Sequence, residues 1–382
     1  MMRFGSIFVS TLFLSIHYGA ILYVNSSLLG SFFELNVVSM LFLAGAVGNI
    51  ILFLFAPQLI EMFGKRLLLL ILLCLSLLST LGLAFASTVS VIVFSFLAYS
   101  SFIFVIYYYL DIVLEELSTD TKTGEIRGIY LTIINIGIAL GPLVTATLVE
   151  GPTLRPIYIA AALLLLPSIL LALLSFKSKT PKWHGLHRYH SLLPFNLWWR
   201  TKGLRHATLA KLVLESFFGL MIIYVPVYLH SVIGFEWETL GIMFFIMLLP
   251  FVIFQWPVGE LADRFIGEKE LMIIGFLIMG AATFSMPYLG PVVILWTAIL
   301  FLSRVGASLI EVTTESYFFK HVRAEDTRLI SIFRLARPAG FIVGAVVGSL
   351  TLNLFSFEKI FFVLVVIIFF GLRESLSIRD TR

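Results

Sequence analysis

The chain has 382 residues, of which 60% are hydrophobic and only 13% are charged, and its formal net charge is +4. Soluble domains carry about 25% charged residues, so this composition excludes a water-soluble globular enzyme and indicates a protein of the lipid bilayer. The single cysteine, Cys74, excludes an internal disulfide and a metal site built from several cysteines. The excess of basic residues is typical of segments that face anionic lipid headgroups, and we expect no nucleic-acid partner.

Twelve apolar stretches follow one another along the chain, with the charged residues gathered between them. About 20 helical residues cross the roughly 30 Å hydrocarbon layer, and a helix satisfies its own backbone hydrogen bonds there. We therefore predict an all-α integral membrane protein of twelve transmembrane helices, at residues 4–28, 37–60, 67–86, 91–114, 128–149, 156–176, 207–229, 239–258, 271–289, 291–318, 329–353 and 359–373. The first stretch follows Arg3 and lacks a clear cleavage site, so we expect it to remain as a span.

The Lys and Arg residues are distributed unevenly over the segments between these spans. Only Arg155 and Lys359 lie outside when the N-terminus is placed in the cytoplasm. Four fall within spans: Lys211, Arg304, Arg334 and Arg337. All the others among the 26 lie on the inner side. The positive-inside rule therefore predicts a multi-pass protein of the cell or cytoplasmic membrane with both termini in the cytoplasm.

The two halves of the chain repeat each other at an interval of about 200 residues. An acid, a glycine and basic residues follow span two as Glu61, Gly64, Lys65 and Arg66, and follow span eight within Gly259, Asp263, Arg264, Gly267 and Lys269. Acids recur near the ends of spans four and ten as Asp111, Glu115, Glu311 and Glu315, and an arginine precedes spans five and eleven as Arg127 and Arg328. We predict two pseudo-symmetric six-helix bundles, at 1–176 and 207–382, joined by a basic cytoplasmic linker at 177–206. Basic residues mixed with Trp favour a linker that rests on the membrane over one that binds a partner.

Two of these motifs carry a family resemblance. The segment from Gly259 through Asp263 and Arg264 to Gly267 and Lys269 resembles the loop motif of the major facilitator superfamily. In the first-half copy, Pro57, Glu61 and Met62 replace the Gly, Asp and Arg of that motif. Span five resembles a signature of proton-coupled exporters in the same superfamily through Gly128, Gly137, Gly141 and Pro142, although Thr145 and Ala146 replace its closing glycine pair. The resemblance covers essentially the whole chain and implies a secondary transporter that works by alternating access.

The resemblance also implies roles for these residues. Asp263 would accept hydrogen bonds from the N-terminal amides of a facing helix and hold the cytoplasmic side shut, with ordinary surface ion pairs as the alternative. Gly137, Gly141 and Pro142 would shape the seam between the halves, with plain helix packing as the alternative.

Charged side chains within the spans need partners, because each costs at least ~2.5–3.5 kcal/mol near the centre of a bilayer. Lys211 and Glu215 lie four residues apart on span seven and can pair. Glu311 and Glu315 share a face of span ten, and we expect Arg334 and Arg337 of span eleven to pair with them. We interpret Glu311, Glu315, Arg334 and Arg337 as a gate network near the cytoplasmic end rather than as a solute site.

Proton coupling requires a group that gains and loses a proton as access alternates. A buried carboxylate suits this role, and Glu215 is the first candidate, followed by Asp111 and Glu311. His17 in span one is a further candidate, with a packing role as its alternative. Arg304 lies in mid-span, where it either extends to the interface or faces the cavity and meets an anion or Glu215.

We therefore predict a secondary active transporter that moves a small solute and is driven by a proton gradient, with no bound cofactor or metal. The resemblance in span five favours proton-coupled export, and import or facilitated diffusion of a metabolite is the alternative. A membrane enzyme or receptor is less favoured, because the sequence has no catalytic constellation and no metal-ligand cluster. The expected partners are the solute, protons and the lipid bilayer, and we expect a monomer.

Overall fold

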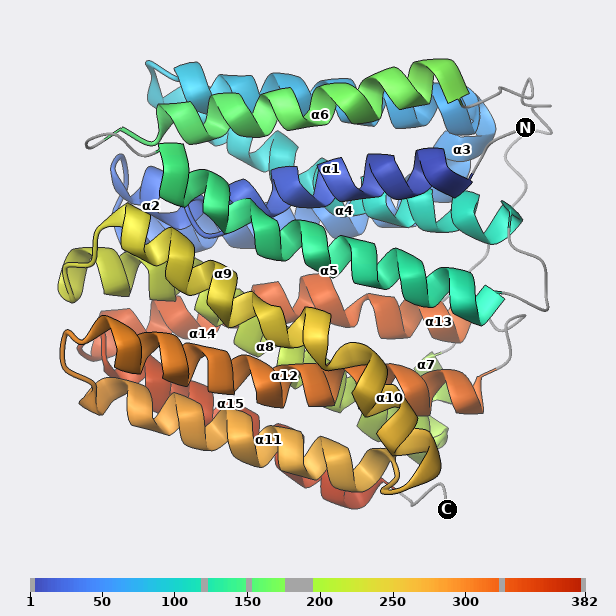
Figure 1. The fold of residues 1–382 in the computed structure, drawn as a ribbon, viewed down its shortest axis with the longest axis vertical. Helices are drawn as coiled ribbons and strands as arrows, with labels where there is room; N and C mark the ends of the chain where they lie inside the picture. Colours follow the sequence, from blue (N-terminus) through green and yellow to red (C-terminus); the bar gives the residue numbers. More distant parts are fainter. Residues whose placement is uncertain (1–3, 118–122, 149–152, 176–194, 323–326, 379–382) are drawn as a thin grey trace. The chain divides into compact units, whose positions relative to one another are not determined.

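The computed structural model describes residues 4–117, 123–148, 153–175, 195–322 and 327–378. Every regular element within these ranges is helical, which confirms the predicted all-α fold (Figure 1). Some side chains inside the helices lie outside what the structure describes; those with predicted roles are Asp111, Glu115, Arg127, Asp263, Arg264 and Arg328.

Eleven helical segments of the described residues are long and apolar enough to cross a bilayer, so the protein is a multi-pass membrane protein. The eighth predicted span, 239–258, is the one not among these eleven, because its helix is shorter than expected: α9 (Trp237–Ile253) has 17 residues, and α10 (Gln255–Arg264) follows it after a break at Phe254. The break has a local cause, because Pro257 has no N–H to donate to the carbonyl of Ile253 four residues earlier.

The chain divides into two compact units, one comprising Met1–Arg188 with Glu236–Phe245 and the other Tyr189–Phe235 with Ile246–Arg382. Unit 1 contains α1 (Phe4–Leu22), α2 (Asn25–Gly30), α3 (Leu35–Phe85), α4 (Val89–Leu117), α5 (Thr123–Leu148) and α6 (Arg155–Ser175). Within it α1 packs against α5 and α6, and α3 packs against α4 and α6.

Unit 2 contains α7 (Phe195–Arg200), α8 (Lys202–Val227), α11 (Glu268–Ser285), α12 (Val293–His321), α13 (Thr327–Arg334), α14 (Ala336–Leu354) and α15 (Lys359–Ser377), together with α10 and the end of α9. A π-helical turn (Tyr228–Val232) extends α8, and a short 3-10 turn (Met286–Tyr288) extends α11. In this unit α8 packs against α12, α14 and α15.

Two glycines give the two halves the same turn. Gly64 interrupts α3 with φ 71° and ψ 160°, and so separates two predicted spans that otherwise form one continuous helix. Gly267 precedes α11 with φ 96° and ψ 156°. Glycine adopts positive φ without the steric cost that a Cβ brings, which explains its place in both copies of the predicted loop motif.

The predicted loop motif is largely helical. Residues 259–264 belong to α10, and only 265–267 form the turn before α11. Glu61 likewise lies within α3, on the last helical turn before Gly64. The second-half motif therefore ends α10 and begins α11, with a single turn of three residues between them, whereas Gly64 alone interrupts the helix in the first half.

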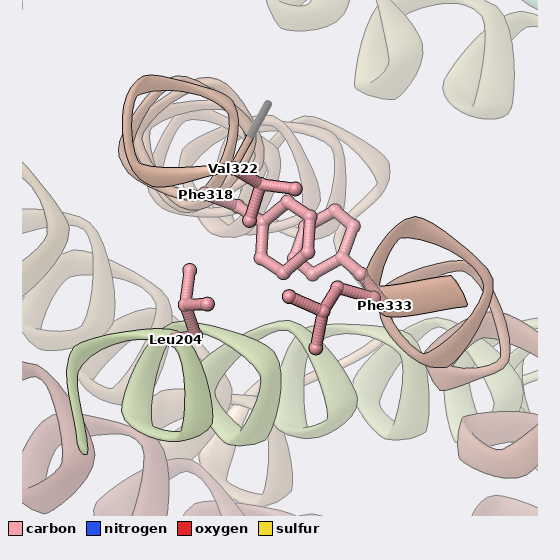
Figure 2. Close-up of a cluster of buried hydrophobic side chains, with 5 residues drawn as sticks. Leu204, Phe318, Val322 and Phe333 are labelled. Carbon is pink, nitrogen blue, oxygen red and sulfur yellow. The ribbon is translucent and has the colours of Figure 1, made fainter. Parts of the chain in front are cut away.

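An apolar cluster joins α8, α12 and α13 at one end of unit 2. Its buried members are Leu204, Phe318, Val322, Leu329 and Phe333, four of which Figure 2 labels. The rings of Phe318 and Phe333 stack with their centroids 4.2 Å apart. This contact holds the short helix α13 against the end of α12, next to the charged residues described below.

Candidate functional site

Six charged side chains of unit 2 form a contiguous group, which we call the charge cluster: Lys211 and Glu215 on α8, Glu311 and Glu315 on α12, Arg334 at the end of α13 and Arg337 at the start of α14. Lys211 is at its centre. Its Nζ lies 3.4 Å from Glu215 Oε1, 3.5 Å from Glu311 Oε1 and 3.4 Å from Glu315 Oε1. The predicted pair of Lys211 and Glu215 is therefore present.

The two arginines complete the charge cluster from the other side. Arg334 Nη1 lies 3.7 Å from Glu315 Oε1, as the sequence predicts. Arg337 Nε instead lies 3.5 Å from Glu215 Oε2, because α14 packs against α8 along its length. Glu215 thus lies between a lysine on its own helix and an arginine on α14.

Burial makes the pairing within the charge cluster consequential. The side chains of Glu215 and Lys211 are 1% and 7% exposed, and a buried charge that loses its partner typically costs about 3–5 kcal/mol. The cluster therefore ties the middle of α8 to the later part of α12, the end of α13 and the start of α14. Separating these helices, or adding a proton to one carboxylate, changes the balance of the whole group.

Arg304 is buried in the middle of α12, 1% exposed. Its guanidinium carbon lies 4.8 Å from the ring centroid of Phe217 and 5.7 Å from that of Phe218, both on α8. A guanidinium over an aromatic face gains a favourable electrostatic interaction. Of the two predicted placements, extension to the interface is wrong, because the side chain stays among these rings.

His17 belongs to a row of hydrogen bonds that join α6 to α1 and α2. Its Nδ1 lies 2.8 Å from the carbonyl oxygen of Ala161. On one side of His17 in this row, Ser168 Oγ donates a hydrogen bond to the carbonyl of Ser10. On the other side, Tyr158 Oη donates one to Asn25 Oδ1. His17 thus has a packing contact at Nδ1, while its Nε2 has no hydrogen-bond partner within the described residues, and the proton-carrying role stays a prediction.

The glycines of span five lie against α1, within unit 1. A Cβ at Gly141 would overlap the backbone of Gly19, and one at Gly137 would lie 2.9 Å from the carbonyl oxygen of Leu12. On another face of α5, Pro142 and Ala146 approach Gly241 so closely that its own Cβ would lie 2.6 Å from the carbonyl oxygen of Pro142. The observed contact of Gly137 and Gly141 is thus close packing of α1 on α5.

Unit 2 repeats this arrangement between α8 and α14. A Cβ at Gly344 would lie 2.9 Å from the backbone nitrogen of Leu220 and 3.1 Å from the carbonyl carbon of Gly219. A Cβ at Gly340 would lie 2.6 Å from the carbonyl carbon of Glu215. The close glycine contact therefore occurs in both units between the helices that occupy equivalent places in the repeat, as a duplicated architecture predicts.

Several other residues with predicted roles lie outside the charge cluster. Arg66 Nη2 donates a hydrogen bond to the carbonyl of Leu173 on α6, while Glu61 is exposed and Lys65 and Lys269 are half-buried. Gly128 lies in α5. The side chains of Asp111, Glu115, Arg127, Asp263, Arg264 and Arg328 lie outside the described residues, so their predicted roles stay predictions.

One buried acid, Glu268, was not predicted from the sequence. Glu268, the first residue of α11, is 0% exposed, accepts a hydrogen bond of 3.0 Å from Ser316 and forms an ion pair with Lys320, both near the end of α12. His206 Nδ1 similarly lies 2.6 Å from Glu374 Oε2, between α8 and α15. The sequence does show that Glu268 is an acid next to the motif glycine Gly267. Its partners on α12 become apparent only from the packing of α11 on α12.

No group of three or more His, Cys, Asp and Glu side chains suited to a metal ion occurs among the residues that the structure describes. The buried polar groups of this described part include the charge cluster, Glu268 with its partners, the cation at Arg304, the imidazole of His17, and amide and hydroxyl groups. These groups can bind, orient and exchange protons with a solute.

Comparison with known proteins gives a consistent picture. A family model described as Major Facilitator Superfamily matches residues 3–322 and 238–374. The crystal structure of a mutant of nucleoside transporter NupG matches with a TM-score of 0.81 at 12% identity, covering 98% of this chain and 99% of that one. A second crystal structure of nucleoside transporter NupG matches with a TM-score of 0.77 at 13% identity, covering 99% of each chain. No curated protein matches the sequence.

Proposed function

The chain belongs to the major facilitator superfamily, and from this premise we propose that it is a secondary transporter that moves a small solute across the membrane by alternating access. The match of the family model to both halves is the observation that carries this proposal. A transporter accounts for buried charges and hydroxyls in apolar helices, because such groups commonly mark the pathway of a solute or a proton.

Nucleosides are the first solutes to test. The two similar solved structures are named as nucleoside transporters, and their backbones match this chain over nearly its whole length. At 12–13% identity this likeness concerns the fold, so it selects the probe and does not identify the solute.

We propose that a proton gradient drives transport through the charge cluster. Glu215 is the coupling candidate, because it is buried and lies between Lys211 and Arg337, on two helices that must separate if this end of unit 2 opens. Protonation of Glu215 would remove its attraction to both cations and so make separation easier. Asp111 and Glu311 remain the next candidates.

The direction of transport is a separate proposal. Export is supported by the resemblance of Gly128, Gly137, Gly141 and Pro142 to the span-five signature of proton-coupled exporters. Import or facilitated diffusion of a metabolite is the second candidate, and nucleoside-transporter neighbours suit it equally well. We also propose that the protein is a monomer without a cofactor.

The test is uptake of radiolabelled uridine and adenosine into inverted and right-side-out membrane vesicles, with and without an imposed pH gradient. Proton-coupled export predicts accumulation in inverted vesicles whose interior is acid. Glu215→Gln should abolish the effect of the pH gradient by removing the titratable group, while solute exchange without a gradient continues.

Glu34→Gln is the matched control, because Glu34 is an exposed acid at the start of α3. It should transport as the wild type does. Accumulation only in right-side-out vesicles would replace export by import, and a Glu215→Gln variant with unaltered pH dependence would remove Glu215 from the coupling step.

A further inference from the structure

Four tyrosines from α1, α4 and α6 come together in the interior of unit 1, and we call them the tyrosine cluster: Tyr18, Tyr99, Tyr107 and Tyr158. Tyr158 and Tyr99 are 0% and 2% exposed, Tyr18 is 9% exposed, and Tyr107 is half-buried. The rings of Tyr18 and Tyr107 lie edge to face at 6.2 Å. The cluster is thus buried at one side and reaches partly exposed surface at Tyr107.

Within the tyrosine cluster, the buried hydroxyl of Tyr99 lacks a hydrogen-bond partner among the described residues. Tyr158 Oη donates to Asn25 Oδ1 at 2.7 Å, and Tyr107 Oη donates to Ser15 Oγ at 3.0 Å. Tyr99 Oη is fully buried and has no hydrogen-bond partner among the residues that the structure describes. The ring of His17, the residue before Tyr18 on α1, packs edge to face on Tyr99 with the centroids 5.6 Å apart, and His17 Nε2 has no hydrogen-bond partner within the described residues either.

A buried hydroxyl without a partner costs roughly 1–3 kcal/mol, so such groups generally have a ligand or a water in the functional state. The other residues that satisfy the cluster, Asn25 and Ser15, are also uncharged. The donors and acceptors of the site are therefore hydroxyls, an amide and the imidazole of His17, beside flat aromatic faces. This chemistry suits a solute that carries hydroxyl groups and no formal charge, because a charged solute would be buried there without a counter-charge.

We propose that the tyrosine cluster binds the transported solute, that Tyr99 Oη forms a hydrogen bond with it, and that the solute is an uncharged, hydroxyl-bearing molecule. This inference rests on the proposed transport function and names the class of solute and the group in unit 1 that recognises it. The charge cluster, which lies in unit 2, would then serve coupling rather than recognition.

The experiment compares Tyr99→Phe with Tyr109→Phe in the purified full-length protein. Tyr109 is a matched control, since it lies on α4, is 0% exposed and also has an Oη with no partner within the described part of the chain. Binding of uridine and adenosine is measured by calorimetry, with uridine 5′-monophosphate as the charged comparator. Thermal unfolding without solute shows whether each variant is folded.

Loss of one hydrogen bond of about 1 kcal/mol should weaken nucleoside binding by Tyr99→Phe roughly five- to tenfold. Tyr109→Phe should bind as the wild type does, and the monophosphate should bind at least about tenfold more weakly than uridine. Both variants should unfold at or above the wild-type temperature, because each loses an unsatisfied buried hydroxyl.

Equal affinity of Tyr99→Phe and wild type would overturn the role of Tyr99. Tighter binding of the monophosphate, or binding of neither nucleoside by the wild type, would overturn the assignment of the solute class. Neither result decides the transport proposal, which depends on movement of solute across vesicle membranes and on its pH dependence. Conversely, nucleoside binding without any transport would refute the proposed function and leave the binding site in place.

Discussion

Lys211 illustrates how much can depend on a single side chain. Three carboxylates lie within 3.5 Å of its Nζ, and only 7% of the side chain is exposed. Without this cation, Glu215 would keep Arg337 and Glu315 would keep Arg334, but Glu311 would lose its lysine. The negative charges would then face one another across α8 and α12 at low dielectric, where their repulsion is strong.

We expect Lys211→Met to destabilise the protein by about 3–5 kcal/mol, since it breaks a buried ion-pair group by removing one member. Thermal unfolding in detergent, followed by tryptophan fluorescence, measures the effect. The double variant Lys211→Met with Glu215→Gln should recover part of the loss by removing a buried negative charge as well. Lys359→Met is the control at an exposed lysine and should change little; equal loss at both sites would refute the central place of Lys211.

The pairings of the charge cluster were only partly predictable. Helical spacing identifies Lys211 with Glu215 because both lie on one helix. The partners of Arg337 depend on which helices pack together, and the sequence suggested Glu311 or Glu315 where the structure has Glu215. Nothing in the sequence pointed to Tyr99. Whether a buried hydroxyl has a hydrogen-bond partner depends on residues that are distant in the chain.

At the scale of elements, glycine sets how closely two helix pairs approach. Gly19 meets Gly141 between α1 and α5, and Gly219 meets Gly344 between α8 and α14. Backbone meets backbone at both contacts, so no side-chain rotation can make room for an added methyl group. Each contact therefore fixes the geometry of its own unit.

We expect Gly141→Ala and Gly344→Ala each to lower stability by about 1–3 kcal/mol, because overpacking outweighs the better helix propensity of alanine, worth at most about 1 kcal/mol. Thermal unfolding again gives the measure. Gly5→Ala in α1 is the control, since a Cβ there would meet nothing within 4 Å, and it should be neutral or slightly stabilising. Unchanged unfolding of Gly141→Ala would show that α1 and α5 can separate at no cost.

Hydropathy predicted most of the helices, because a bilayer imposes length and apolarity on every span. It failed where local backbone chemistry intervenes. Pro257 divides the predicted span 239–258 into α9 and α10. The π-helical turn at Tyr228–Val232 has no counterpart in the hydropathy pattern either.

At the scale of the molecule, the repeat and the charge distribution together predict the topology. The segment around Phe265 should lie in the cytoplasm and that around Gly290 outside, since α11 crosses between them. Both positions are exposed, and replacing Cys74 by Ser leaves no other cysteine in the chain.

A membrane-impermeant maleimide should therefore label Gly290→Cys in intact cells and leave Phe265→Cys unlabelled, each in the Cys74→Ser background. Permeabilised cells should label both variants, which controls for reactivity. The opposite labelling pattern would invert the molecule in the membrane and place both termini outside.

The composition of the charge cluster has an electrical consequence. Lys211, Arg334 and Arg337 balance Glu215, Glu311 and Glu315, so the group has no net charge when all six side chains are ionised. A membrane voltage does about 2.3 kcal/mol of work per elementary charge per 100 mV, and on a neutral group that moves as one body it does almost none. One added proton gives the group a net charge of +1. The protonated form of unit 2 would then respond to the membrane voltage, and the unprotonated form would not.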